Sequence, residues 1–407
     1  MRQDGPLHRR LFRRRRLLTV AQSRPLQDRL QLILEEPFRA FFPLGVLGGL
    51  AGVWPWVGYR LGWADSYSGI GHGLLQIQGF EMAFAIGFLM TTLPRFLETN
   101  RTRLWELGIG WSLCATGIVA LTLNAWRLGE GLFLALAVHV SLFGLRRLRS
   151  RGDDPPPFFA FFPVGFLSAG GGAALILWPQ PGFERLGETL VEQGILLAFV
   201  LAVGSFLGPR LLYGNRTFPE TTTQSAQRQR LVFGGVGLAL AISFPIEVAV
   251  HSGAGQVLRA VIVSGYLFGI LRVYRSPVQP WFHVHLLRLS FWSLCVGLWM
   301  PPLLPDHSLA ALHLTFIGGF GLMTMIIATR VVTGHCDAES LWQGNRLPIV
   351  VPVGLIALSV PVRLAADMAP LLYFECLAAA GVLWLAGVGL WGLIFLPKLG
   401  PSHVSPG

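Results

Sequence analysis

The chain has few charged residues and almost no lysine. Only 13% of its 407 residues are Asp, Glu, Lys or Arg, which is about half the share found in a soluble globular domain. Lys398 is the only lysine, so arginine carries nearly all of the net charge of +11. There is no P-loop, HExxH, GxSxG or Rossmann motif, and the four cysteines form no CxxC. These absences argue against the common soluble enzyme classes and against a disulfide scaffold.

The chain is instead rich in long apolar segments. Hydrophobic residues make up 53% of it, and the mean hydropathy is +0.56. Because a membrane-spanning helix needs about 20 apolar residues, segmentation at proline, glycine and charge predicts an all-α polytopic membrane protein of about twelve spans. We place them near 40–60, 70–93, 104–124, 129–145, 157–178, 190–208, 230–250, 256–272, 281–300, 308–329, 347–363 and 370–396.

The arginines are distributed unevenly between the two ends of these spans. One set of ends carries the cluster Arg9–Arg16 and most later arginines, whereas the other carries only a few, such as Arg60 and Arg363. The positive-inside rule then places both termini in the cytoplasm. We interpret the basic charge as orientation signal and anionic-lipid contact rather than nucleic-acid binding. Residues 26–36 are predicted to form a short amphipathic helix on that surface.

Three similar segments lie 120 residues apart. Residues 37–47 (PFRAFFPLGVL) match residues 157–167 (PFFAFFPVGFL), and residues 277–287 are a weaker third copy. Such repeats indicate pseudosymmetric packing with sites where the repeats meet. We therefore divide the chain into a basic N-terminal segment, three repeats of four spans each and a tail. Their limits are 1–36, 37–154, 155–276, 277–399 and 400–407.

Three histidines fall at the outer ends of two spans. His72 begins the second span, and His307 and His313 begin the tenth. Histidines at the ends of membrane helices are rare and indicate a metal or cofactor site. From facing helices, two imidazoles can hold a haem iron, or they can bind copper together with a third ligand. The alternative is an interfacial histidine that is hydrogen-bonded to a loop.

A second group of potential ligands lies at the cytoplasmic side. His283 and His285 begin the ninth span, and His335 and Cys336 follow the tenth. Imidazole and thiolate together suit copper. On a helix, however, residues i and i+2 point about 200° apart, so His283 and His285 are not expected to bind the same ion. An inert, buried thiol is the alternative for Cys336.

Two charged residues lie within predicted spans. Glu81 falls near the middle of the second span, where a carboxylate is a functional residue by default. Arg288, about two turns into the ninth span, is a possible partner for it. Arg288 is alternatively a contact of a haem propionate or a residue that reaches to the interface.

The segment from residue 313 to residue 335 resembles the NnrS family of bacterial membrane proteins. It has the family's histidine, glycine-rich helix, Thr-Arg pair and Gly-His. Residues 87–94 and the opening segment 37–45 also match, and the resemblance extends over about residues 35–397. The matching positions are His313, Gly318, Gly321, Met323, Thr324, Thr329, Arg330, Gly334 and His335.

This resemblance implies haem b and copper, the bacterial inner membrane, and a role in nitric oxide stress or denitrification. It aligns His72 with the first histidine of the family's His-x-His-Glu-Met motif, but Leu74 and Leu75 replace the second histidine and the glutamate. The family's Gly-His-Thr-Gly-Arg becomes Gly-His-Cys-Asp-Ala at residues 334–338. One metal position is therefore expected to be lost or altered.

The predicted architecture is also similar to the core subunit of the haem-copper oxidases. In that family, histidines on the second and tenth helices hold a low-spin haem near the outer face, and His72 and His313 fall at that depth. The oxidase copper ligands come from helices six and seven. Here the sixth span has no histidine, and the seventh has only His251 at its outer end. An oxygen-reducing binuclear centre is therefore not expected.

The sequence favours a haem-binding membrane protein in the nitric oxide response. His72 and His313 would be axial ligands, with Arg330 and Arg288 as further cofactor contacts. The alternative is a transporter or metal-delivery permease without haem, in which Glu81 and Arg288 line a path. A third reading is a structural partner of a respiratory complex. Substrate, electron donor and oligomeric state stay open.

Overall fold

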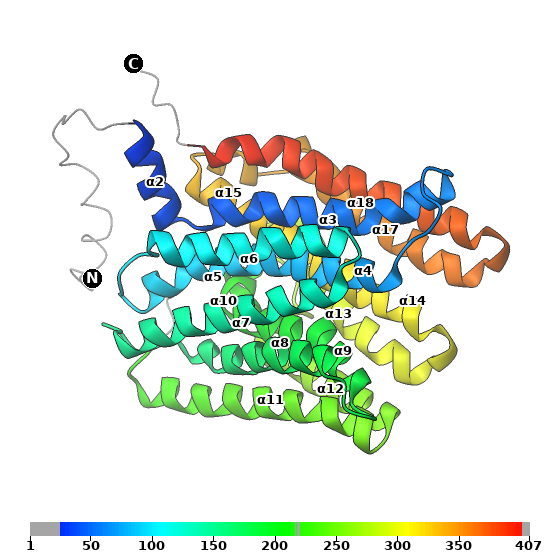
Figure 1. Ribbon diagram of the computed structural model, residues 1–407. Coiled ribbons are helices and arrows are strands. Elements are labelled where there is room, and N and C mark those ends of the chain that lie inside the picture. The colour runs from blue at the N-terminus through cyan, green and yellow to red at the C-terminus, as the bar shows by residue number, and fades with distance from the viewer. Residues whose placement is uncertain (1–24, 216, 218–219, 401–407) are drawn as a thin grey trace.

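The computed structural model describes residues 25–215, 217 and 220–400, and within them the chain is helical without strands. Twelve helices are long and apolar enough to span a membrane, which confirms the predicted all-α polytopic fold (Figure 1). The spans are α3 (Phe38–Arg60), α4–η1–α5 (Gly69–Phe96), α6 (Leu104–Thr122), α7 (Trp126–Arg149), η2–α8 (Pro157–Leu177), α9–η3–α10 (Glu184–Tyr213), α11 (Gln224–Ala249), α12–η4 (Ser252–Leu271), α13 (Phe282–Leu303), η5–α14–η6–α15 (Pro305–His335), α17 (Leu347–Met368) and η7–α18–η8 (Pro370–Leu399).

Several helices continue beyond the apolar segments that predict them. The sixth span begins at Glu184 rather than near 190, the tenth ends at His335 rather than near 329, and the eleventh ends at Met368 rather than near 363. A helix satisfies its own backbone hydrogen bonds and need not stop where its apolar residues stop. Two short helices, α2 (Pro25–Glu35) and α16 (Glu339–Trp342), lie outside the spans. The predicted basic cluster at residues 9–16 lies outside the described residues.

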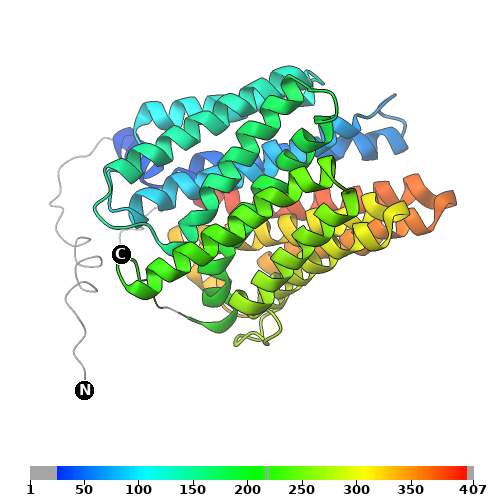
Figure 2. The ribbon, with the colours of Figure 1, turned by 90° about the horizontal axis from the view of Figure 1, so that it is seen from below.

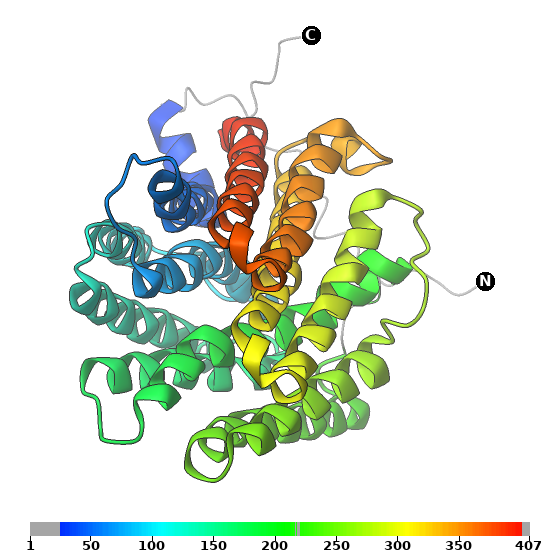
Figure 3. The same cartoon turned by 90° about the vertical axis from the view of Figure 1, so that its right-hand side faces the viewer.

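The spans follow one another around the molecule in chain order. This is clear in the view along the helices (Figure 3), and the view from below shows their long axes running in similar directions (Figure 2). The last span packs on the first: the indole Nε1 of Trp384 in α18 donates to the carbonyl oxygen of Gly49 in α3 at 3.1 Å. The first and last spans therefore close the arrangement.

Three π-helical segments interrupt the second, sixth and tenth spans. They are η1 (Leu75–Glu81), η3 (Leu190–Gly194) and η6 (Leu314–Gly321); a fourth, η4 (Leu267–Leu271), ends the eighth span. π-helical turns are rare and frequently occur at functional sites. Their recurrence in the second helix of each four-span unit agrees with the three repeats, whose limits stay a prediction.

Close helix contact fixes the first two spans against each other at Gly48 in α3 and Gly79 in η1. A Cβ added to Gly48 would lie 2.5 Å from the carbonyl carbon of Gly79 and 2.8 Å from its oxygen. These are backbone atoms, so the contact can be relieved only by moving a helix. Small residues allow such close packing between membrane helices.

We expect Gly48→Ala to destabilise the protein by about 1–3 kcal/mol, the usual cost of overpacking a tight contact. Thermal unfolding in detergent would measure the loss. Gly108→Ala in α6 is the matched control, because a Cβ there meets no atom within 4 Å and alanine favours the helix. Equal stability of the two variants would contradict the packing argument.

Candidate functional site

The structure brings two of the predicted histidines together near one end of the second and tenth spans. His72 lies in α4 (Gly69–Leu74), and His313 ends α14 (Ser308–His313). Their ring centres are 6.4 Å apart, and their ring planes differ by only 11°. Each histidine lies within three residues of a π-helical segment, η1 or η6. The two imidazoles are therefore parallel neighbours held by separate helices.

Backbone carbonyls orient both rings. The Nδ1 atom of His72 lies 2.8 Å from the carbonyl oxygen of Gly52, and that of His313 lies 2.7 Å from the carbonyl oxygen of Leu309. A carbonyl oxygen only accepts, so each Nδ1 carries the hydrogen and donates it. Each Nε2 then keeps its lone pair. A histidine ligand of a metal is commonly held in this way by its other ring nitrogen.

A buried arginine lies beside this pair. Arg363 of α17 is 7% exposed, and its Nη1 atom has no hydrogen-bond partner in the described part of the chain. It is close enough to both imidazoles to interact with them electrostatically. The sequence places Arg363 at the end of the eleventh span. The helix instead continues five residues further, to Met368, so Arg363 lies within it. The sequence signal for a functional role of Arg363 was its position in the last turns of an apolar helix.

The donor set fits an iron porphyrin better than a bare metal ion. No group of three or more His, Cys, Asp or Glu residues gathers as a metal site among the described residues, whereas protein sites for single transition-metal ions commonly have three or four ligands. A porphyrin supplies four nitrogens and needs only axial ligands. Two imidazoles whose ring centres lie 6.4 Å apart could both bind one iron, because metal–nitrogen bonds are about 2 Å long. The unpaired Nη1 of Arg363 suits a propionate carboxylate.

Two other predicted ligands lie apart from the pair. His307 is exposed in the turn η5 (Pro305–His307), and its Nδ1 atom lies 2.8 Å from a carboxylate oxygen of Asp367. Arg330 lies near the opposite end of the tenth span, where its guanidinium pairs with Glu339 at 2.5 Å and lies over the ring of Trp342. The structure therefore does not bring either residue to the paired imidazoles.

Glu81 and Arg288 are not partners. The hydroxyl of Thr324 in α15 (Leu322–His335) donates to Glu81 at 2.6 Å, so the second and tenth spans are linked at this depth. Arg288 donates to the carbonyl oxygens of Val273 and Tyr274, just after the eighth span. The predicted Glu81–Arg288 pair is therefore replaced by a carboxyl–hydroxyl pair.

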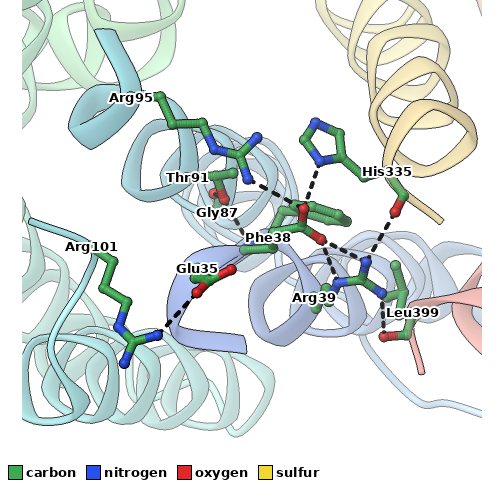
Figure 4. Close-up of polar contacts among 10 residues, drawn as sticks. Glu35, Phe38, Arg39, Gly87, Thr91, Arg95, Arg101, His335 and Leu399 are labelled. Carbon is green, nitrogen blue, oxygen red and sulfur yellow. Dashed lines mark hydrogen bonds and ion pairs between the residues drawn. The ribbon is translucent and has the colours of Figure 1, made fainter. Parts of the chain in front are cut away.

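The other end of the spans holds a polar cluster around the carboxylate of Glu36. Figure 4 shows Arg39, Arg95 and His335 converging on one carboxylate. The Nδ1 atom of His335 lies 2.8 Å from Glu36, Arg39 pairs with it at 2.6 Å, and Arg95 at 3.2 Å. Arg39 also donates to the carbonyl oxygen of Leu399 at 2.8 Å. The cluster thus ties the ends of the first, second, tenth and twelfth spans together.

The other predicted copper ligands do not join His335 in a metal site. Burial raises the pKa of the Cys336 thiol, more than the nearby Arg39 lowers it. His283 is fully buried between Trp281 and Trp342, and neither of its ring nitrogens has a partner among the described residues. His285 is exposed. The expectation that His283 and His285 point to different sides agrees with these positions.

The fold and the paired imidazoles define a class: a twelve-span helical membrane protein with two histidines adjacent on its second and tenth spans. Within that class, the chain belongs to the NnrS family, since the family model described as NnrS protein matches residues 32–401. No curated protein matches the chain. Membership supports a multi-pass membrane protein of a haem and copper type in general.

The Glu36 cluster generates a pH prediction. Burial alone would raise the pKa of Glu36, but the hydrogen bonds and charges of His335 and Arg39 outweigh burial and lower the pKa from 4.5 to about 2. The stabilisation is therefore present above pH 4.5 and is lost as the pH falls toward 2. We expect Glu36→Gln to cost about 2–4 kcal/mol at pH 7 and to flatten the loss of stability on acidification.

Thermal unfolding in detergent at pH 7 and pH 3 would measure both effects. Glu35→Gln is the matched control, because Glu35 is exposed and forms only a surface pair with Arg101 worth less than about 1 kcal/mol. If the two variants lost equal stability, the Glu36 cluster would not hold the span ends together.

Proposed function

We propose that the protein is a haem-binding protein of the bacterial inner membrane that acts in nitric oxide tolerance or denitrification-linked redox chemistry. The observation that carries the proposal is the parallel pair of His72 and His313, with both Nδ1 atoms bonded to backbone carbonyls. Membership of the NnrS family supports it. Haem b would lie between the two spans with these histidines as its axial ligands.

The chain's own residues would define the properties of that site. The carbonyl oxygens of Gly52 and Leu309 fix the ring orientation of the two imidazoles. They also make each Nε2 atom a stronger electron-pair donor to a metal. Arg363 would pair with a propionate and supply positive charge beside the iron. When bound, haem would supply one-electron redox chemistry.

Copper receives less support than haem. His335 is engaged by Glu36, the Cys336 thiol is disfavoured as a thiolate, and the nearby histidines do not complete a set of three ligands in the described chain. The substitutions at Leu74 and Leu75 agree with an altered metal position. Metal analysis of the purified protein tests copper directly. One copper per chain would support the expectation that the protein binds both haem and copper.

The transporter alternative loses one of its two residues. Arg288 is bonded to carbonyls after the eighth span, away from the Glu81–Thr324 pair. A transporter without haem would purify colourless, and its transport would depend on Glu81. Pigment content therefore separates the two functions.

We expect the purified protein to show a Soret band and sharp reduced α and β bands, typical of iron with two axial histidines. His72→Ala and His313→Ala should each lose most of the bound haem, because each removes one axial bond. Absorption spectra with haem quantified per chain would measure this. His307→Ala is the control on the same span end, and it should keep the native spectrum because His307 is exposed and pairs with Asp367.

A colourless native protein from haem-replete cells would refute the haem proposal. Loss of haem in His307→Ala with retention in His313→Ala would show that His307, and not His313, binds the iron. Size-exclusion profiles would show that each variant is folded before its spectrum is compared.

We expect Arg363→Leu to lower the haem reduction potential. A buried cation stabilises the reduced, less positive iron, so its removal favours the oxidised form. The shift should be on the order of 60 mV, which is about 1.4 kcal/mol for one electron. Redox titration followed by absorbance would measure it. Arg60→Leu is a control at the same outer end, because Arg60 is about half exposed and pairs with Glu375; equal shifts would mean that Arg363 has no specific role.

A further inference from the structure

An apolar cavity lies where the second, sixth and tenth spans meet, apart from the paired histidines. Its walls come from η1 and α5 (Met82–Phe96), α10 (Ile195–Tyr213), η6 and α15, and one side is covered by Phe42 of α3. Its volume is about 80 Å³, and it is partly open to the surroundings.

The cavity is lined by corresponding positions of the three predicted repeats. Offsets of 115 and 235 residues relate Arg95, Arg210 and Arg330, near the cytoplasmic ends of these spans. The same offsets relate Ala85, Val200 and Phe320, and also Phe88, Val203 and Met323, and all six residues line the cavity. Sites in membrane proteins built from repeats commonly lie at such interfaces.

The polar groups of the lining break this symmetry. Among the lining residues, only Glu81 and Thr324 carry polar side chains, and Thr324 donates to the Oε2 atom of Glu81 at 2.6 Å. No hydrogen bond from the described residues reaches the Oε1 atom of Glu81, although its side chain is only 6% exposed. The positions related to Glu81 by the two offsets are Leu196 and Phe316. The Glu81–Thr324 pair is therefore the one polar group on an otherwise apolar wall.

The lining excludes several classes of ligand. It contains no Lys, Arg or His, so an anionic ligand would lack a counter-charge. It contains one carboxyl, whereas a divalent cation needs several oxygen ligands. A plain acyl chain would leave Glu81 without a hydrogen-bond donor. Five phenylalanines suit a flat ring. These are Phe42, Phe84, Phe88, Phe199 and Phe320.

We propose that this cavity binds a lipid-soluble hydroquinone. The ring would pack among the phenylalanines, and one phenolic hydroxyl would donate to the free oxygen of Glu81. An apolar tail would extend through the open part of the cavity. The inference goes beyond the haem proposal and does not depend on it, because neither His72 nor His313 lines the cavity.

The test compares two ligands that differ only in their hydroxyl groups. Binding of 2-decylhydroquinone and of decylbenzene would be measured on full-length protein in lipid nanodiscs, with empty nanodiscs subtracted to remove partitioning into lipid. Native protein should bind the hydroquinone at least tenfold more tightly. Glu81→Leu should abolish this preference. Ala85→Leu should weaken both ligands, because it fills the cavity.

Glu130→Gln is the matched control. Glu130 is another buried carboxyl within a span, but it accepts a hydrogen bond from Gln78 at 2.7 Å and does not line the cavity. This variant should keep the native preference for the hydroquinone. Native-like size-exclusion profiles would be required of all variants.

Three results would overturn the proposal. Equal binding of the two ligands by native protein would define a crevice for lipid tails, and this comparison needs no variant to fold. Absence of protein-dependent hydroquinone binding would remove the site. A preference unchanged in Glu81→Leu would place the hydroxyl elsewhere. Haem content is measured separately by absorbance, so the two proposals can fail independently.

Discussion

The hydrocarbon interior of a membrane tolerates few unpaired polar groups, and this constraint shapes the whole structure. Most buried charges meet it with a partner: Glu106 binds Arg147 at 2.7 Å, and Glu247 binds Arg259. Some buried polar atoms nevertheless lack a hydrogen-bond partner among the described residues, such as Arg147 Nε, Glu130 Oε2 and the ring nitrogens of His283. Arg363 Nη1 and Glu81 Oε1 also lack one. Each also lies beside a feature that can receive a ligand, the histidine pair or the apolar cavity. Both sites thus contain an unpaired polar atom, although such atoms are not confined to them.

The π-helical segments show how the chain builds these sites from ordinary spans. A π-helical turn widens the helix and interrupts the regular backbone hydrogen bonds, which costs stability. In the second and tenth spans, η1 and η6 begin within three residues of His72 and His313. Both segments end at the depth of the Glu81 carboxyl and the cavity. The irregular backbone therefore lies between the paired histidines, where we propose haem, and the cavity, where we propose an organic ligand.

Sequence patterns predict the spans well because hydrophobic length is a local property. The sequence predicts the pairing of His72 with His313, because both lie at the same depth in their spans. It does not predict the partners of the buried charges. Thr324 lies 243 residues from Glu81, and no local pattern indicates that they meet. Arg363 was assigned to a loop because apolar length does not mark the last turns of a helix. His335 was predicted to be a metal ligand, but its ring is hydrogen-bonded to Glu36, which lies 299 residues away in the chain.

The two sites also have complementary chemistry. Two axial imidazoles would occupy both open positions of the iron, so a small molecule needs a different place to bind while they remain. Glu81 lies nine residues beyond His72 on the same span, and the last seven of these residues form η1. Under the two proposals, one span would hold both a haem ligand and the acceptor for a hydroquinone hydroxyl. The family's pattern of histidines accounts for the first part, whereas the Glu81–Thr324 pair becomes visible only when the spans are packed together.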